Sequence, residues 1–162
     1  MKEKTTLPTY GAGLVYVAVI VALTVAGIVL SVYVIPNGRF AFLWIPFAVV
    51  GSLLVVFGAY LWFAAVLKAK IDDGIKQNKL VKTGVYAFVR NPIYSAFLFV
   101  CTGALFIANN LWLLILPLVY WAYLTVLMKN TEEKWLLKTF GAEYEEYCEE
   151  VNRCIPWIPK KR

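Results

Sequence analysis

Hydrophobic residues run along this chain in long stretches that charged residues seldom interrupt. Residues 11–39 hold one charge, Arg39 at their end, and residues 40–67 and 91–128 hold none. A membrane-spanning helix needs about 20 predominantly apolar residues, so the first two stretches can each cross a bilayer once and the third can cross it twice. The pattern therefore predicts an all-α integral membrane protein.

Turn residues divide these stretches into four predicted transmembrane helices. A Pro-Asn-Gly turn at 36–38 separates the first two, because proline stops a helix and Asn-Gly accepts positive φ. An Asn-Asn pair at 109–110 separates the third and fourth, which we expect to form a helical hairpin. The four predicted spans are residues 11–35, 40–67, 93–108 and 111–128.

Two features of these spans bear on helix packing. Pro117 lies inside the fourth predicted span and should kink it, which either opens space for a ligand or serves packing. Small residues also recur at regular spacing on the first two spans, a pattern typical of closely packed membrane helices. These small residues are Ala18, Ala22 and Ala26 on the first span, and Gly51 and Gly58 on the second.

The polar parts of the chain complete a single membrane domain over residues 1–162. An N-terminal two-helix hairpin at 11–67 is followed by a cytosolic connector at 68–83. From Lys129 onward we expect amphipathic cytosolic helices, with Gly141 ending one of them and starting another. Tyr144 and Tyr147 lie on the apolar face of the second of these helices.

The charges of the chain predict its orientation and its partners. With four spans, 15 of the 16 Lys and Arg residues and all ten acidic residues fall on one side, and Arg39 is the exception. The positive-inside rule makes that side cytosolic, together with both termini. The net charge of +6 is explained by anionic lipid headgroups, which Lys160, Lys161 and Arg162 would contact, so we expect membrane lipids and no nucleic acid as partners.

The chain contains no histidine, which excludes histidine-based metal sites, Ser-His-Asp triads and imidazole bases. Its three cysteines, Cys101, Cys148 and Cys154, show no C-x-x-C spacing and are interpreted as ordinary thiols. We therefore expect no metal site. Any chemistry must use carboxylates, Arg, Lys, Tyr, Cys or an organic cofactor.

Polar groups gather at the predicted cytosolic ends of the third and fourth spans. Arg90, Asn91 and Tyr94 lie at the cytosolic end of the third span, and Glu132 and Glu133 lie at the cytosolic end of the fourth. A site there could hold a water-soluble cofactor and admit a lipophilic substrate from the membrane. On composition alone, an interfacial anchor whose arginine reaches the headgroups is the favoured explanation of the first group.

Two ordered motifs flank the predicted hairpin. The first is Gly84-Val85-Tyr86 followed by Arg90-Asn91-Pro92-Ile93-Tyr94, and the second comprises Glu132, Glu133, Leu136, Phe140, Gly141, Tyr144, Tyr147, Val151, Arg153 and Pro156. Together they resemble the isoprenylcysteine carboxyl methyltransferase family and its phospholipid methyltransferase relatives. The resemblance covers residues 80–156, and it makes residues 84–156 a methyltransferase-like core.

The resemblance implies a membrane methyltransferase that binds S-adenosylmethionine in a cytosol-facing pocket and receives its acceptor from the lipid. Carried over to this chain, the catalytic residues are Arg90, Glu132 and Arg153. The cofactor-binding residues are Gly84, Tyr86, Arg90, Asn91, Pro92, Tyr94, Glu132, Glu133, Tyr144 and Tyr147. The family usually has Arg-His-Pro where this chain has an asparagine, so an amide that cannot titrate replaces the imidazole.

The residues leave the acceptor and the activity open. The carboxylate of an isoprenylcysteine-like group needs no base and suits Arg90 or Arg153, whereas a phospholipid amine needs a base such as Glu132 or Glu133. A non-catalytic membrane protein that retains the family fold is the alternative. A small four-helix transporter is disfavoured because the spans contain no ionisable residue. The oligomeric state is not indicated.

Overall fold

The computed structural model describes residues 12–71 and 79–159, and within these ranges the regular structure is entirely helical. The six α-helices are α1 Ala12–Tyr33, α2 Trp44–Ile71, α3 Pro92–Ile107, α4 Leu116–Asn130, α5 Glu132–Phe140 and α6 Ala142–Glu150. Four short 3₁₀ turns connect them: η1 Pro36–Gly38, η2 Ala41–Leu43, η3 Gly84–Ala87 and η4 Leu111–Ile115. The predicted all-α fold is confirmed.

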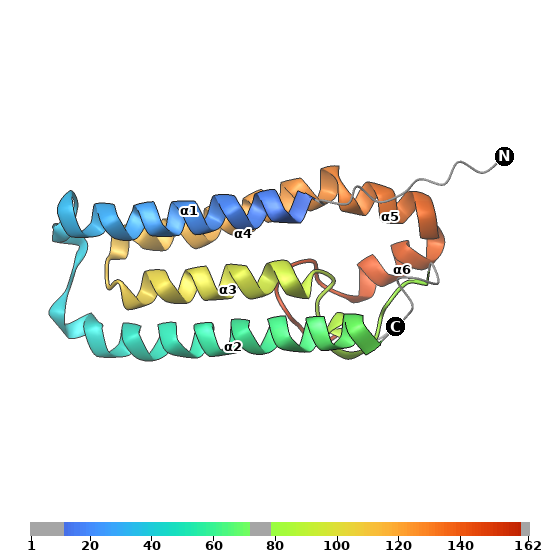
Figure 1. Cartoon of the computed structure of the whole chain (residues 1–162), viewed down its shortest axis with the longest axis horizontal. Coiled ribbons are helices and arrows are strands. Elements are labelled where there is room, and N and C mark those ends of the chain that lie inside the picture. Colours follow the sequence, from blue (N-terminus) through green and yellow to red (C-terminus); the bar gives the residue numbers. More distant parts are fainter. Residues whose placement is uncertain (1–11, 72–78, 160–162) are drawn as a thin grey trace.

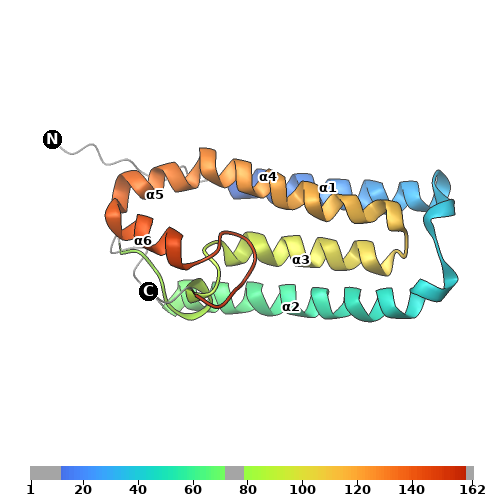
Figure 2. The same cartoon turned by 180° about the vertical axis from the view of Figure 1, so that it is seen from behind.

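Four long helices lie side by side, and α3 runs between α2 and the pair formed by α1 and α4 (Figure 1). The packing of α3 against α2 is the most extensive in the fold. Both views place α5 and α6 at one end of the bundle, at the end where α2 finishes and α3 begins (Figure 2). The turns between α1 and α2 and between α3 and α4 lie at the opposite end.

Glycines allow α2 and α3 to approach closely. A Cβ added at Gly51 would lie 2.6 Å from the carbonyl oxygen of Gly103, and one added at Gly58 would lie 2.7 Å from that of Ala96. These glycines therefore pack as their spacing predicts. The alanines of the first helix do not, because Ala18, Ala22 and Ala26 are all exposed.

Three helical segments are long and apolar enough to cross a bilayer: Gly13–Tyr33, Ala41–Leu67 and Leu111–Phe140. The helix α3 is also apolar, but at 16 residues it is shorter than these. Large apolar side chains such as Leu53 and Val56 of α2 and Leu118 of α4 point outward and are more than 60% exposed. Such faces suit acyl chains, so the protein is an integral membrane protein with at least these three candidate spans.

Two helix boundaries differ from those predicted. Pro117 is the second residue of α4, after the 3₁₀ turn η4, so it lies in the first helical turn, where an amide has no intrahelical partner. It therefore lies at the junction of η4 and α4, and not in the interior of the α-helix as predicted. The helix α2 begins at Trp44 and continues to Ile71, so the predicted connector starts inside a helix. Residues 72–78 of that connector lie outside the described residues.

Two buried clusters organise the fold. The larger joins α1, α3 and α4, with Tyr16, Tyr120 and Leu124 fully buried, and it includes Cys154 from beyond α6. The smaller one lies under α6 and contains Tyr144, Tyr147 and Val151. The predicted apolar face of the last helix is thus confirmed, and it seals the end of the bundle at which α3 begins.

Candidate functional site

The structure gathers the polar residues of both motifs at one end of the bundle. A tail segment, residues 151–159, returns from α6 toward the start of α3 and completes this region (Figure 1). Gly141 makes the return possible, because its φ of 54° lies in the left-handed region and separates α5 from α6. The loop before α3, the start of α5, the helix α6 and the tail segment thus contribute to a common site.

Glu133 lies at the centre of this site and binds two arginines. Its Oε1 accepts from Arg153 Nε at 2.6 Å, and its Oε2 accepts from Arg153 Nη2 at 2.9 Å. Arg90 Nη1 lies 3.2 Å from Glu133 Oε1. The side chains of Glu133 and Arg90 are only 10% and 7% exposed, so these charges are well shielded from water. We call these three residues the charged cluster; it carries two positive charges and one negative charge.

Arg90 has further partners on α6 and one donor without a partner. Its Nη1 donates to the Tyr144 hydroxyl at 3.4 Å and to the Cys148 thiol, and its guanidinium carbon lies 5.9 Å from the centre of the Tyr144 ring. Its Nε is buried and has no hydrogen-bond partner among the described residues. A buried arginine with an unused donor is suited to binding an anionic group.

Backbone hydrogen bonds hold the tail segment against the loop before α3. Arg90 N donates to the Asn152 carbonyl at 2.9 Å, and both the amide N and the side-chain Nδ2 of Asn91 donate to the Arg153 carbonyl, at 3.3 and 3.1 Å. Trp157 N donates to the Phe88 carbonyl at 3.1 Å. We call these contacts the clasp. They place the Asn91 amide on the tail segment, where it helps to position Arg153.

Glu132 points to a different partner from its neighbour. Its Oε1 accepts a hydrogen bond from the Tyr94 hydroxyl of α3 at 2.7 Å. The ring of Tyr94 packs edge-on against Tyr16 of α1, with centroids 6.2 Å apart, and its end faces Gly13, where an added Cβ would clash with it. The first helix therefore braces the Tyr94–Glu132 pair.

The remaining predicted residues lie in the loop before α3, at the start of α3 and on α6. Gly84 begins η3 with a φ of 65°, a conformation that favours glycine, and Pro92 starts α3 where no amide hydrogen is needed. The Tyr147 hydroxyl donates to the carbonyl of Tyr86 at 2.6 Å and so ties α6 to η3. Lys82 and Glu143 form an ion pair at 2.9 Å on the exposed rim.

Burial and charge alter the acidity of the groups around Arg90. Burial raises the pKa values of Tyr144, Tyr147 and Cys148, although the Arg90 charge opposes the rise at each. Burial raises the pKa of Cys154 to about 11. The hydrogen bonds to Glu133 raise the pKa of Arg153. The tyrosines and thiols are therefore neutral at physiological pH, and the arginines carry the positive charge of the site.

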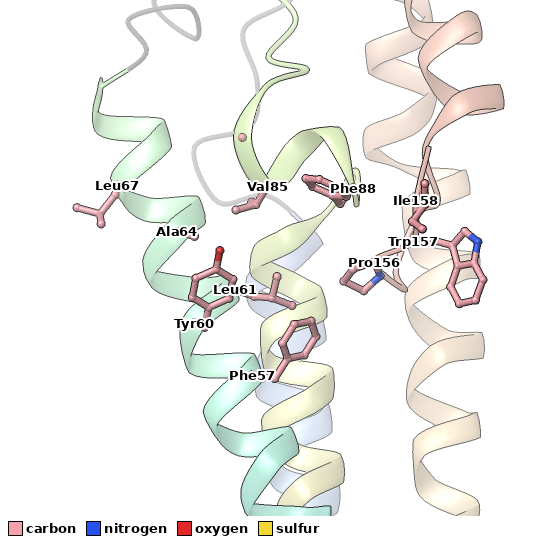
Figure 3. A pocket seen from close by; sticks show the side chains of 11 residues that line it. Phe57, Tyr60, Leu61, Ala64, Leu67, Val85, Phe88, Pro156, Trp157 and Ile158 are labelled. Atoms are coloured by element: carbon pink, nitrogen blue, oxygen red, sulfur yellow. The ribbon is translucent and has the colours of Figure 1, made fainter. Parts of the chain in front are cut away.

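An apolar pocket of about 780 Å³ is lined in part by the loop before α3. Figure 3 shows its walls, which come from α2 between residues 57 and 67, from η3 and Phe88, and from residues 156–158 of the tail segment. Its lining is almost entirely hydrocarbon, with the Tyr60 side chain as a polar exception. Phe88 lines this pocket, and Arg90, two residues later, belongs to the charged cluster.

Sequence reasoning placed most of these residues at one site but missed several partners. The structure brings Arg90, Asn91, Glu133, Tyr144 and Arg153 together, and it sets Tyr94 with Glu132 beside them. Cys148 and the pocket walls on α2 and the tail segment were not predicted as site residues. The α2 residues carry no signal, because an apolar helix in a membrane has no contrasting positions. In the part of the chain that the structure describes, no group of three or more Cys, Asp or Glu residues could hold a metal.

Known proteins match the part of the chain that carries this site. A family profile described as "Phospholipid methyltransferase" matches residues 46–143. Similar proteins include the protein-S-isoprenylcysteine O-methyltransferase of Saccharomyces cerevisiae, 36% identical over 121 residues, which are 68% of this chain and 49% of that protein. A probable protein-S-isoprenylcysteine O-methyltransferase of Oryza sativa subsp. indica is 35% identical over 59% of this chain and 49% of its own.

The Schizosaccharomyces pombe protein-S-isoprenylcysteine O-methyltransferase is 36% identical over 52% of this chain and 36% of its own. No solved structure gives a significant match. The chain spans about half the length of the curated relatives it matches. The family profile covers more than half of the chain, from α2 to the start of α6. It contains the whole first motif and the part of the second motif that precedes Tyr144. The chain therefore belongs to the phospholipid methyltransferase family.

Proposed function

We propose that this protein is a membrane methyltransferase that uses S-adenosylmethionine and transfers the methyl group to a carboxylate on a lipophilic acceptor. The observation that carries the proposal is the charged cluster, in which Arg90 and Arg153 share the single carboxylate of Glu133 at the edge of a membrane bundle. Family membership and the names of the relatives, all O-methyltransferases, support the same activity.

The residues around the charged cluster suit this cofactor. Its α-carboxylate would bind Arg90, whose buried Nε has no partner among the described residues. Its ammonium or ribose hydroxyls would bind the carboxylate of Glu132, with the buried Tyr144 and Tyr147 side chains of α6 forming part of the wall beneath the cofactor. These groups come from different elements but lie at the same end of the fold.

The two glutamates bear on the choice of acceptor. Glu133 accepts from Arg90 and Arg153, and Glu132 accepts from Tyr94, so both carboxylates already have donors. An amine acceptor needs a carboxylate free to remove its proton, whereas a carboxylate acceptor needs none and is attracted by the excess positive charge. The site therefore favours a carboxylate, as in an isoprenylcysteine-like group, over a phospholipid amine.

The methyl transfer itself needs positioning more than acid-base chemistry. S-adenosylmethionine would supply a methyl group bound to a sulfonium sulfur. The carboxylate oxygen of the acceptor would form a bond to this methyl carbon as the bond between the carbon and the sulfur breaks, so that the acceptor becomes a methyl ester and the sulfonium becomes a neutral thioether. Arg153 would hold the acceptor carboxylate, and the clasp fixes Arg153 relative to the start of α3. Buried aromatic and apolar side chains exclude water from the reacting groups.

The apolar pocket supplies a place for the lipophilic part of the acceptor. Its walls on α2 belong to the candidate span Ala41–Leu67, so a chain dissolved in the bilayer can reach it without crossing water. Its volume of about 780 Å³ falls in the range of small-molecule pockets. Phe88 and Arg90 connect this pocket with the charged cluster through three consecutive residues.

We further propose that α3 is a fourth span and that the site faces the cytosol. Both ends of α3 adjoin ends of longer spanning segments in the bundle (Figures 1 and 2). The distribution of Lys and Arg supports the orientation, because among the residues that the structure describes Arg39 is the one cation at the other end of the bundle. In this orientation α5, α6 and the charged cluster meet the cytosolic leaflet.

The proposal is tested by methyl transfer in lipid nanodiscs. Radiolabelled S-adenosylmethionine is supplied with an S-prenylated N-acetylcysteine, with its carboxamide, or with phosphatidylethanolamine. We expect label only in the first acceptor. Label in phosphatidylethanolamine alone would mean that the acceptor group is an amine and not a carboxylate. No label in any lipid fraction, from protein shown to be folded, would favour a non-catalytic member of the family.

The place of the acceptor is tested with a matched pair of variants on α2. Ala64→Phe narrows the pocket, whereas Val66→Phe adds the same side chain two residues away, outside the lining. We expect Ala64→Phe to raise KM for the acceptor without changing cofactor affinity, and Val66→Phe to change neither. Equal effects of the two substitutions on KM would mean that the pocket does not bind the acceptor.

A further inference from the structure

The tail segment exposes large apolar side chains after a helix rich in acidic residues. Ile155, Trp157 and Ile158 are 49%, 66% and 78% exposed. Residues 151–162 contain no acidic side chain and four cations, Arg153 and then Lys160, Lys161 and Arg162. Exposed isoleucine and tryptophan in water cost free energy, so this composition indicates a partner other than water.

The position of this segment along the bundle identifies the partner. Its residues 156–158 line the same pocket as Phe57 and Leu61 of α2 (Figure 3). The α2 wall of that pocket runs from Phe57 to Leu67, the last residue of the candidate span, and the next residue is the first charge, Lys68. At 1.5 Å per helical residue, the pocket therefore extends from the end of the apolar span to roughly 15 Å inside it.

The fold holds the segment at that depth. On one side of it, Cys154 is 2% exposed and packs in the cluster between α1, α3 and α4. In its middle, Trp157 N donates to the Phe88 carbonyl, and Phe88 itself is half exposed beside it. The exposed faces of Ile155, Trp157 and Ile158 are therefore fixed at the level of α2 side chains that face acyl chains.

We propose that Ile155–Ile158 is a re-entrant wedge that dips into the cytosolic leaflet and contacts lipid acyl chains. The cations that follow it would meet anionic headgroups, as basic residues beside a membrane segment do. The partner is thus the bilayer itself. The same segment supplies Asn152 and Arg153 to the clasp and the charged cluster, so contact with lipid supports the geometry of the site.

Spin labels in nanodiscs test the depth directly. A label at Ile158→Cys is compared with Leu53→Cys on the outer face of α2 and with Glu145→Cys on exposed α6, each in a Cys148→Ser background because Cys101 and Cys154 are buried. We expect the Ile158 label to resemble the Leu53 label rather than the Glu145 label, with stronger relaxation by oxygen than by a water-soluble nickel chelate. A label at Ile158 that behaves like the one at Glu145 would overturn the wedge.

A second comparison tests whether apolar contact holds the segment in place. A spin label at Ile155→Cys is measured in two double variants, one that also carries Ile158→Asp and one that also carries Ile158→Leu. We expect Ile158→Asp to increase exposure to the nickel chelate and Ile158→Leu to leave it unchanged, because a carboxylate is costly among acyl chains. Equal exposure in both would contradict the proposal. Neither result depends on methyl transfer, so the wedge and the proposed function can fail separately.

Discussion

Arg153 and Glu133 form a two-point ion pair in which Nε and Nη2 of the arginine lie 2.6 and 2.9 Å from the two carboxylate oxygens. Arg90 approaches the same carboxylate at 3.2 Å, so one glutamate joins α5, the loop before α3 and the tail segment. This shared carboxylate makes the fold and the site depend on the same contacts. Its removal should affect both.

Glu133→Gln should therefore destabilise the protein strongly. Two arginines that are largely shielded would lose their carboxylate, and breaking a buried pair costs about 3–5 kcal/mol. The free energy of unfolding in mixed micelles measures the effect. Glu143→Gln is the matched control: its ion pair with Lys82 is exposed, and such pairs contribute about 0–1 kcal/mol. Similar losses in the two variants would contradict the central position of Glu133.

Asn91→Asp should loosen the tail segment. The substitution replaces the Nδ2 donor with an oxygen beside the Arg153 carbonyl at a partly buried position, where the cost should fall below the roughly 1–3 kcal/mol of a fully buried unsatisfied group. Limited proteolysis after residue 151 should become faster. Asn130→Asp removes an exposed Nδ2 bond to the Val126 carbonyl and should change little. If Asn91→Asp is as resistant to protease as wild type, the side chain does not hold the clasp.

Asn91→His addresses the departure from the family motif. An imidazole N–H can donate to the same carbonyl, so we expect the clasp to survive and cofactor affinity to stay near that of wild type. Titration of S-adenosylhomocysteine into both proteins measures this. A large gain in affinity would mean that asparagine weakens the native site and would favour the non-catalytic alternative.

Gly13→Ala should impair the site from the first helix, outside the region that the family profile covers. The new Cβ would clash with the ring of Tyr94 and displace the hydroxyl that donates to Glu132. We expect weaker cofactor binding. Gly27→Ala on the same helix is the control, because its Cβ would meet only the flexible ends of Leu113 and Leu116, at 3.3 and 3.0 Å. Equal cofactor affinities in the two variants would mean that α1 does not support the site through Tyr94.

The thiols should differ in their reaction with maleimide. Burial raises the pKa of Cys154 to about 11, so its protonated form is favoured in the folded protein and its reactive thiolate appears only as the pH rises toward that value. We expect Cys154 to stay unlabelled at pH 8 and to react once the protein is unfolded in detergent. The partly exposed Cys148 should react first, and bound S-adenosylhomocysteine should protect it through Arg90. Rapid labelling of folded Cys154 at pH 8 would contradict its burial.

Local patterns in the sequence predicted much of this fold. The turn at 36–38, the glycine between α5 and α6 and the apolar face with Tyr144 and Tyr147 all follow from residues close together in the chain. Pro117 misled, because its effect depends on whether a helix has already begun, and the 3₁₀ turn before it delays that start. The alanines of the first helix misled because spacing alone cannot say which face meets the bundle.

The site was predicted as a collection of residues but not as a network. Motif resemblance brought Arg90 and Glu133 into the same region, whereas their shared contact with Arg153 depends on how the tail segment folds back. The role of Asn91 in the clasp depends on a backbone carbonyl, which every residue possesses and no sequence pattern marks. The pocket walls on α2 were missed for a related reason, since apolar residues facing lipid and facing a pocket look alike.

The central claim is that the end of the bundle around Glu132 and the charged cluster binds S-adenosylmethionine. The most direct test is calorimetric titration of S-adenosylhomocysteine into the folded wild-type protein, Glu132→Ala and the rim control Glu143→Gln. Glu132 lies outside the charged cluster, so its loss should spare the fold. We predict saturable binding in wild type and Glu143→Gln and its loss in Glu132→Ala; no saturable binding in wild type, or equal binding in all three, would contradict the account.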